Sequence, residues 1–373
     1  MILRALVRKE VIELRRDPIT LAVAVLLPVV MLFLFGYGIR YDVENVALGV
    51  RDEDRTTESQ RLVERFTKSG YFRQVANFDS PAAVSDALER GKVGIVVIIP
   101  EGFSRDVAQA RKVKVQVLLD GSFSPSALIV SSYAAAIGAQ YASDLAEQAL
   151  QRLGVPRPGE VRMETRIWYN PTMKSVNYIV PGLFAVLLMA FPPMLTALAI
   201  VREKERGTIA QIYVSPVRPA MFVLGKVIPY AVLAYVEMLL VLVVGTAWFE
   251  IPFRGHIAWL LGASVIYVFV TVSLGVLVST VARTQVSAVL LTLVFTLMPS
   301  MLFSGFIFPI GTMPYALQLY TYVFPARYFM DLSRDLFLKG VGIEYLWLNL
   351  VLLGIYALIV VALAASRLKK KVA

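Results

Sequence analysis

The chain has 373 residues, of which 57% are hydrophobic, and a mean hydropathy of +0.67. A soluble globular protein of this size does not need so much apolar surface, so the composition indicates a protein that crosses a membrane several times. The net charge is +10 and there is no cysteine, which excludes disulfides, thiol catalysis and cysteine-based zinc sites.

Residues 1–18 predict an amphipathic elbow helix on the cytoplasmic face of the membrane. Apolar residues such as Leu6 and Leu14 recur at helical spacing, and five Arg and Lys residues lie between them. The pair Asp17-Pro18 ends this helix. A basic amphipathic helix lies in the lipid headgroup layer, and a disordered basic tail is the alternative.

Six apolar segments predict six transmembrane helices, because each is about long enough to cross the hydrocarbon core of a bilayer. They comprise residues 19–39, 176–201, 222–248, 257–281, 286–303 and 345–365. The first segment is too long for the apolar part of a signal peptide, and it lacks a small-residue cleavage site.

The basic residues gather at one set of helix ends. They precede the first segment, follow the second and the sixth, and lie between the fourth and the fifth. With six segments these ends share one side, which the positive-inside rule assigns to the cytoplasm. We therefore expect a bacterial inner (plasma) membrane protein with both termini cytoplasmic, a lipid environment and no nucleic-acid partner. Arg327, Arg334 and Lys339 depart from the rule, since they fall on the opposite side.

Residues 40–175 have the composition of a soluble domain, and the topology makes this domain extracytoplasmic, or periplasmic in a Gram-negative cell. Strand-like runs at 46–50, 72–78, 93–99 and 113–119 alternate with helical patterns at 58–68, 81–89, 103–110 and 126–153. The alternation predicts an α/β fold with a mixed or parallel sheet. The expected fold class is therefore a polytopic α-helical membrane protein with six transmembrane helices, plus an extracytoplasmic α/β domain inserted between helices 1 and 2.

The last five predicted helices lie within residues 176–373. Residues 304–342, between the fifth and the sixth helix, are interrupted too often to form a helix that spans a membrane. This segment contains several prolines and glycines and is rich in Phe and Tyr. Short re-entrant helices on the outer face fit the pattern, because irregular backbone at membrane depth has to pack against protein. The alternative is an aromatic belt at the membrane interface.

Motifs of catalysis are missing from the sequence. There is no Gly-x-x-x-x-Gly-Lys-Ser/Thr phosphate loop, no His-Glu-x-x-His and no Gly-x-Ser-x-Gly. The single histidine, His256, cannot build a histidine-rich metal site. We expect no catalytic residues, no metal site and no enzymatic activity of the chain by itself, which favours a component of a transporter.

Glu237 is a carboxylate in the middle of the third apolar segment. A charge at that depth costs a few kcal/mol on insertion scales, so the side chain should face protein or a cavity. One interpretation is a contact for a cationic substrate, or a proton site. The other is a hydrogen bond to Asn177, Tyr178 or Gln285.

Four further residues are candidates for a substrate path. Asn177 and Tyr178 open the second segment, and Phe184 and Met298 belong to a scatter of Phe and Met in the second and fifth segments. Soft and aromatic side chains adapt to varied apolar ligands. The alternatives are an interfacial anchor for the first two residues, and packing or lipid contact for the others.

A charged stretch, residues 202–219, lies between the second and third segments. Positive-inside anchoring explains its Arg and Lys residues but not the Glu residues between them. Its first part consists of Arg202, Glu203, Lys204, Glu205, Arg206, Gly207 and Thr208.

Four parts of the chain together resemble ABC-2-type transporter permeases of the drug-export branch with a large extracytoplasmic domain. The charged stretch is the most specific, and it resembles the cytoplasmic coupling segment of that family. The other three are Leu14-Arg15-Arg16-Asp17-Pro18, Trp168-Tyr169-Asn170-Pro171 before the second segment, and Phe324-Pro325-Ala326-Arg327-Tyr328 before the last one.

The resemblance implies a half-transporter that pairs with a second permease half, either identical or a sibling. Two ATP-binding cassette subunits would hold ATP and Mg, so that this chain binds no cofactor itself. Residues 202–208 would then dock these subunits and couple ATP hydrolysis to transport. A periplasmic adaptor is a further candidate partner.

The expected substrates are hydrophobic or amphipathic drug-like compounds, and cationic ones if Glu237 contacts them. A lipid or polysaccharide exporter of the same family is an alternative. Outside this family, the residues leave open an ion-coupled antiporter with Glu237 as its coupling site, and a membrane-anchored sensor or scaffold.

Overall fold

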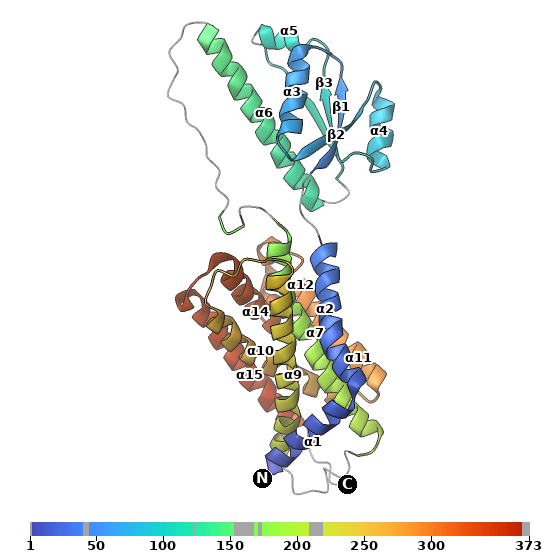
Figure 1. Ribbon diagram of the computed structural model, residues 1–373, viewed down its shortest axis with the longest axis vertical. Coiled ribbons are helices and arrows are strands. Elements are labelled where there is room, and N and C mark those ends of the chain that lie inside the picture. The colour runs from blue at the N-terminus through green and yellow to red at the C-terminus, as the bar shows by residue number, and fades with distance from the viewer. Residues whose placement is uncertain are drawn as a thin grey trace. The chain divides into compact units, whose positions relative to one another are not determined.

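The computed structural model describes residues 2–39, 45–109, 111–121, 124–152, 168–170, 174–208 and 219–367. The chain forms two compact units (Figure 1). One unit contains residues 1–40 and 167–373, and the other contains residues 41–166.

Among the described residues, six helices of the first unit are long and apolar enough to cross a membrane, which confirms the predicted number of spans. The short amphipathic helix α1 (Ile2–Arg16) precedes them. The six are α2 (Pro18–Gly38), α7 (Val176–Glu205), α9 (Pro219–Ala247), α10 (Ile257–Val281), the composite fifth helix (Gln285–Phe303) and α15 (Ile343–Arg367).

Helix α7 is the core of this unit. In its most apolar stretch 89% of the residues are buried, against 22% for α2 and 17% for α15. It contacts α2, α9, α10, α11 and α14, so other helices cover most of its surface (Figure 1). A helix buried on all sides is expected to be apolar all round, as α7 is along its membrane part. Every other long helix of the unit except α15 packs directly on it.

The fifth helix consists of α11 (Gln285–Thr292), a π-helical turn (Leu293–Leu297) and α12 (Met298–Phe303). Its inner face carries a row of buried hydroxyl residues, and Thr292 and Thr296 both donate to the carbonyl four residues earlier at 2.7 Å. Small side chains with internally satisfied hydroxyls allow close helix packing, here against α7. The outer face is a row of exposed apolar residues that includes Leu290 and Met298.

The segment before the last helix folds into short helices: a 3-10 turn (Ile310–Thr312), α13 (Tyr315–Thr321), α14 (Pro325–Arg334) and a π-turn (Asp335–Lys339). Helix α14 is largely buried against α7, α10 and α15. The Phe329 ring stacks on Tyr267 with centroids 4.2 Å apart, and Ser333 donates to the Pro181 carbonyl at 2.8 Å. The segment therefore packs on the helical bundle, as the re-entrant interpretation requires; its depth in a membrane stays a prediction.

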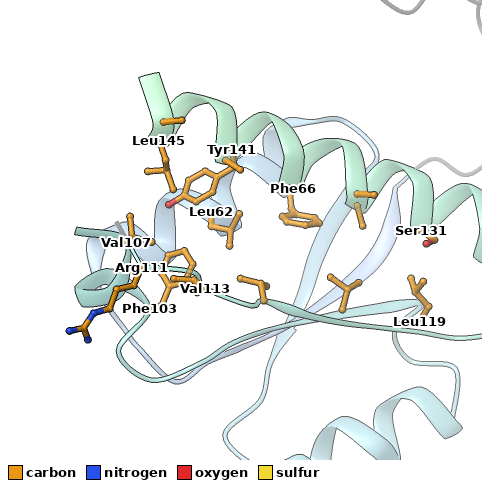
Figure 2. Close-up of a pocket in the computed structure, with 17 residues that line it drawn as sticks. Leu62, Phe66, Phe103, Val107, Arg111, Val113, Leu119, Ser131, Tyr141 and Leu145 are labelled. Carbon is orange, nitrogen blue, oxygen red and sulfur yellow. The ribbon is translucent and has the colours of Figure 1, made fainter. Parts of the chain in front are cut away.

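The second unit is built on a four-stranded sheet with the order β2-β1-β3-β4, in which only β4 is antiparallel to its neighbour. Helices α3 and α6 cover one face and α4 covers the other. Helix α6 leaves a cavity against β4 (Figure 2). The elements are β1 (Val46–Asp52), α3 (Thr57–Lys68), β2 (Phe72–Asn77), α4 (Pro81–Glu89), β3 (Ile95–Ile99), α5 (Phe103–Ala108), β4 (Gln116–Leu119) and α6 (Ser124–Arg152).

Gly275 of α10 marks the closest approach of two helices. A Cβ atom there would lie 2.3 Å from the carbonyl oxygen of Pro193 in α7. Gly275→Ala should therefore push α7 and α10 apart and destabilise the unit by about 1–3 kcal/mol. We expect a lower midpoint of thermal unfolding for the purified chain in detergent. Gly354→Ala, where a Cβ meets no atom within 4 Å, is the matched control, and equal midpoints for the two variants would contradict the close contact.

Candidate functional site

The predicted coupling residues lie at the end of α7, which continues to Glu205, four residues beyond the predicted end of the apolar segment. Gly207 follows in a left-handed conformation with φ of 73°, as is common just after a helix. Residues 209–218 of the predicted coupling segment lie outside the described residues. The structure therefore describes Arg202 to Thr208 of this segment.

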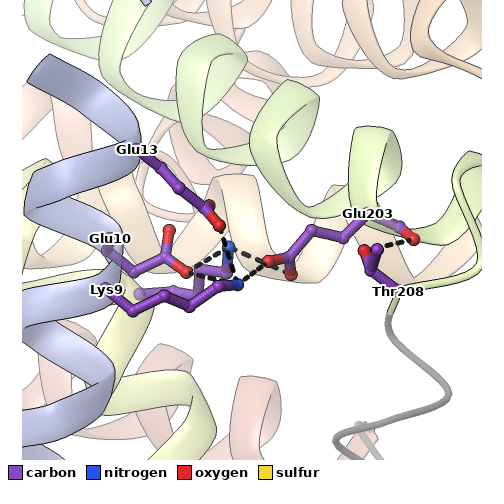
Figure 3. A network of polar contacts seen from close by, with 6 residues as sticks. Lys9, Glu10, Glu13, Glu203 and Thr208 are labelled. Carbon is purple, nitrogen blue, oxygen red and sulfur yellow. Dashed lines mark hydrogen bonds and ion pairs between the residues drawn. The ribbon is translucent and has the colours of Figure 1, made fainter. Parts of the chain in front are cut away.

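Lys226 of α9 lies at the centre of a cluster of charges between three helices, and Figure 3 shows how Lys9, Glu10, Glu13 and Glu203 converge in it. Its side chain is almost fully buried, and its Nζ lies 2.6 Å from Glu10 Oε1 in α1 and 3.0 Å from Glu203 Oε2 in α7. Lys9 also pairs with Glu203, and it approaches Glu13 at 3.2 Å. We call these five residues the Lys226 cluster.

Burial and neighbouring charges act in opposite directions on the pKa values of Lys9 and Glu10. Burial lowers the pKa of Lys9, but the hydrogen bond and charge of Glu203, with Glu10 and Glu13 nearby, raise this pKa above its ordinary value. Burial raises the pKa of Glu10 above its ordinary value, although the ammonium of Lys226 opposes that effect. The carboxylates of Glu10, Glu13 and Glu203 lie within 4.8 Å of one another, a spacing that a metal ion would also need. Each of them contacts Lys9, so the arrangement fits ion pairing and not a metal site.

Arg202 connects the end of α7 to the start of α2. Its guanidinium pairs with the carboxylate of Asp17, the residue that caps α2 by accepting a hydrogen bond from the Thr20 amide at 3.0 Å. The hydroxyl and amide of Thr20 are the main causes that lower the pKa of Asp17 to about 2, and Arg202 adds to them. This ion pair connects the first turn of α2 to the last turn of α7.

Two further residues connect α7 to the helices on its other side. Glu205 accepts a hydrogen bond from the backbone amide of Gln285 at 2.9 Å and also binds its side chain, at the first residue of α11. Lys204 donates to the carbonyl of Ser279 near the end of α10. The last turn of α7 therefore contacts α1, α2, α9, α10 and α11 through polar side chains.

Exposure divides the seven predicted coupling residues into two groups. Glu203 is buried, and Arg202 and Lys204 are half-buried and engaged within the chain. The exposed group, which lies at the very end of the helix, consists of Glu205, Arg206, Gly207 and Thr208.

Sequence reasoning missed the partners of Glu203. From the sequence alone, neither Lys226 nor Glu10 could be recognised as a partner of Glu203. A signal for Glu10 exists: it follows Leu6 and precedes Leu14 by four residues, so it lies on the apolar face of α1. A carboxylate on the buried face of an amphipathic helix requires a cationic partner.

Glu237 has 2% of its surface exposed, and neither of its carboxylate oxygens has a hydrogen-bond partner among the described residues. The predicted hydrogen bonds to Asn177, Tyr178 or Gln285 are wrong. Asn177 donates to Asn170 Oδ1 at 2.9 Å, the Tyr178 hydroxyl lies 3.4 Å from the Gly305 carbonyl, and Gln285 is held by Glu205.

The remaining predicted substrate-path residues have separate surroundings. Tyr178 lies under the Arg334 guanidinium, 3.7 Å from its ring centroid. Phe184 is fully buried with its ring 5.3 Å from that of Phe337, whereas Met298 is 54% exposed on the outer face of the fifth helix. The contacts of the described residues do not join them, or Glu237, into one site.

These features define a polytopic helical membrane protein whose central helix is held at one end by buried ion pairs. The chain belongs to the ABC-2 family of transporter proteins, since the profile of this family matches residues 18–366. It is therefore an integral membrane protein related to transporter permeases.

Named relatives agree with this assignment. The chain is 32% identical to the probable multidrug ABC transporter permease YbhR of Escherichia coli (strain K12), over 92% of either chain. It is 31% identical to the probable multidrug ABC transporter permease YbhS of the same strain, over 99% of this chain and 97% of that protein. The inner membrane transport permease YhhJ of this strain is 26% identical over 80% of this chain and 79% of its own length.

Lys226→Met should leave the buried carboxylates of Glu10 and Glu203 with only the partly exposed Lys9 as a partner. We expect it to destabilise the chain by up to about 3–5 kcal/mol, the usual cost of breaking a buried ion pair. The measurement is the midpoint of thermal unfolding in detergent. Lys68→Met is the matched control, because the Lys68–Glu64 pair in α3 is exposed and should contribute less than about 1 kcal/mol.

Adding Glu10→Gln and Glu203→Gln to Lys226→Met should restore part of the lost stability. The two carboxylates that faced Lys226 are then neutral amides, so no buried negative charge is left without its partner. A Lys226→Met variant that is as stable as Lys68→Met would show that the Lys226 cluster does not hold the three helices together.

Proposed function

We propose that this chain is the membrane-spanning permease subunit of an ATP-driven exporter in the bacterial inner membrane. It moves hydrophobic or amphipathic compounds, including drug-like ones, out of the cytoplasm or the inner membrane. Membership of the ABC-2 family and two relatives named as probable multidrug permeases support the proposal. The observation that carries it is the end of α7, where polar contacts to five helices meet an exposed charged turn.

The partners are an ATP-binding cassette subunit, which binds ATP and Mg, and a second permease half. Both termini and the end of α7 lie in the cytoplasm, as the distribution of basic residues predicts. Residues 40–175 then form an extracytoplasmic domain. The sequence lacks a phosphate loop, so ATP hydrolysis belongs to the partner subunit.

Coupling divides between the two groups of residues at the end of α7. The exposed Glu205 and Arg206 contact the ATP-binding subunit. The buried Glu203 and the half-buried Arg202 pass a movement of α7 on to α1, α2 and α9, because their partners lie on those helices. A rigid set of ion pairs transmits a displacement that a layer of flexible side chains would absorb.

Arg206→Glu should weaken the complex with the ATP-binding subunit, because it reverses an exposed charge at the proposed interface. We expect at least ~10-fold less ATP-binding subunit to co-purify with a tagged chain, together with a matching loss of ATP hydrolysis. The candidate subunits are those encoded in the chain's own genome. Arg367→Glu, at the exposed end of α15, makes the same charge change on the same predicted face outside the coupling segment.

Co-purification that is unchanged in Arg206→Glu would remove this residue from the interface. If the folded wild-type chain retained none of the ATP-binding subunits, the proposal of ATP-driven export would fail. Transport by this chain alone in proteoliposomes would then favour the ion-coupled antiporter.

Glu237 is the proposed contact for cationic compounds, because it is a buried carboxylate that no described side chain satisfies. Glu237→Gln should lower the export of cationic substrates by about 10-fold, equivalent to ~1.4 kcal/mol, and leave neutral substrates unchanged. The measurement is efflux of a matched cationic and neutral pair from cells. Glu250→Gln, beyond the outer end of α9 and exposed, is the control, and equal efflux of both compounds in Glu237→Gln would exclude Glu237 from the path.

A further inference from the structure

The second unit contains a cavity of about 680 Å³ between α6 and the sheet (Figure 2). Well-packed protein interiors contain few voids larger than a water molecule. Ligand pockets usually have volumes of about 300–1,000 Å³. The cavity is therefore much too large for a packing defect and has the size of a small-molecule site.

The wall on the sheet side consists of apolar side chains that point toward α6. Val113, Val115, Val117 and Leu119 alternate along β4 and the chain leading into it, so all four side chains lie on one face. They are only partly buried, although they belong to the apolar core of this unit. Apolar side chains left partly uncovered in this way are suited to contact an apolar ligand.

The wall on the helix side is made largely of small residues, which leave space in front of the helix. Helix α6 presents Ala134, Ala135, Gly138 and Ala142 to the cavity, and Tyr141 and Leu145 line it as well. A Cβ atom built on Gly138 meets no atom within 4 Å. The cavity thus lies directly in front of this glycine.

Charge within the cavity is confined to one end. Among the described residues that line the cavity, Arg111 is the only charged one, and it lies near Phe103 at one end, whereas Leu119 and Ser131 lie at the other (Figure 2). Tyr141, the only phenol of this described lining, already donates to Glu58 Oε1 at 2.7 Å. Apart from the Ser131 hydroxyl, the rest of the described lining is therefore apolar.

Two arginines lie at the charged end. Arg105 Nε and Arg111 Nη1 approach the same oxygen of Asp106, at 3.5 Å and 3.7 Å. Both side chains are largely exposed, and both contacts are longer than a normal charge-assisted hydrogen bond. Arg111 can therefore still donate to an anionic group placed at this end of the cavity.

We propose that this cavity binds an amphiphile with one anionic head and an elongated apolar body, of which a fatty acid is the simplest example. The head lies at Arg111, and the body extends between β4 and α6 toward Leu119. The proposal concerns the second unit alone and does not depend on the proposed export function. It also differs in charge from the substrates suggested by Glu237.

The test is photo-crosslinking of the full chain in nanodiscs of zwitterionic lipid with a fatty acid that carries a diazirine on its chain. Labelled peptides are then identified by mass spectrometry. We expect labels on β4 and on the part of α6 around Gly138, in addition to labels on the apolar helices exposed to lipid. The labels on those helices serve as an internal reference for the amount of probe in the membrane.

Gly138→Leu should lower the labelling of β4 and α6 by at least ~10-fold relative to the apolar helices, because leucine fills space in front of the helix and a filled interior excludes the ligand. Leucine also favours a helix more than glycine does, so α6 should persist. Ala139→Leu is the matched control: the neighbouring residue is exposed and does not line the cavity.

Arg111→Glu tests the recognition of the head. It should lower labelling of the cavity by the acid but not by the uncharged fatty alcohol with the same diazirine chain. The exposed neighbour Lys112, changed to Glu, is the control for a general effect of charge. Absence of cavity labels in the wild-type chain, or equal labelling in Gly138→Leu and Ala139→Leu, would overturn the site. Equal loss of acid and alcohol in Arg111→Glu would overturn the role of Arg111.

Discussion

The arrangement of the membrane unit depends on the compensation of one buried ammonium group. Transferring the charge of Lys226 out of water costs several kcal/mol unless anionic partners are held in place beside it. Glu10 and Glu203 supply those partners from two different helices. None of α1, α7 and α9 can move away from the others at this end without leaving a charge uncompensated. We therefore expect the three helix ends to move together as a rigid body. Because α7 is also the core of the bundle, its orientation determines where the remaining helices pack.

How much was predictable from the sequence depends on whether a feature is local. The apolar segments predicted the membrane helices well, and α10 begins and ends at the predicted residues 257 and 281, because length and hydropathy are properties of one stretch of chain. Strands β1 to β4 overlap the strand-like runs predicted at 46–50, 72–78, 93–99 and 113–119 for the same reason. Pairing between distant residues is not local. The interleaved charges of residues 202–206 identified the end of α7 as a candidate site, but only the fold shows that Glu203 faces Lys226 while Arg206 faces outward.

Two buried acidic residues of the same unit represent opposite solutions to one physical problem. Glu203 is buried and pairs with the buried ammonium of Lys226 and the partly exposed ammonium of Lys9, so its charge contributes to the packing of the helices. Glu237 is buried without a partner, so its polar atoms contribute nothing to the stability of the described structure and impose a cost on it. A residue that costs stability where it lies is a stronger candidate for a role in transport than one that stabilises the fold. The resemblance to a known family covered the charged stretch that contains Glu203 and gave no role to Glu237.

The depth of the charges at the end of α7 has a consequence for their response to dissolved ions. Mobile ions screen charges that are in contact with water, and at physiological ionic strength they do so over about 8 Å. Lys226, Glu10 and Glu203 are buried, whereas Glu205 and Arg206 are exposed to the solvent. A rise in salt concentration therefore weakens attraction at the exposed turn and has much less effect on the buried pairs of Lys226. The connection between the three helices thus depends less on the ionic strength around the protein than the exposed surface of the same helix end does.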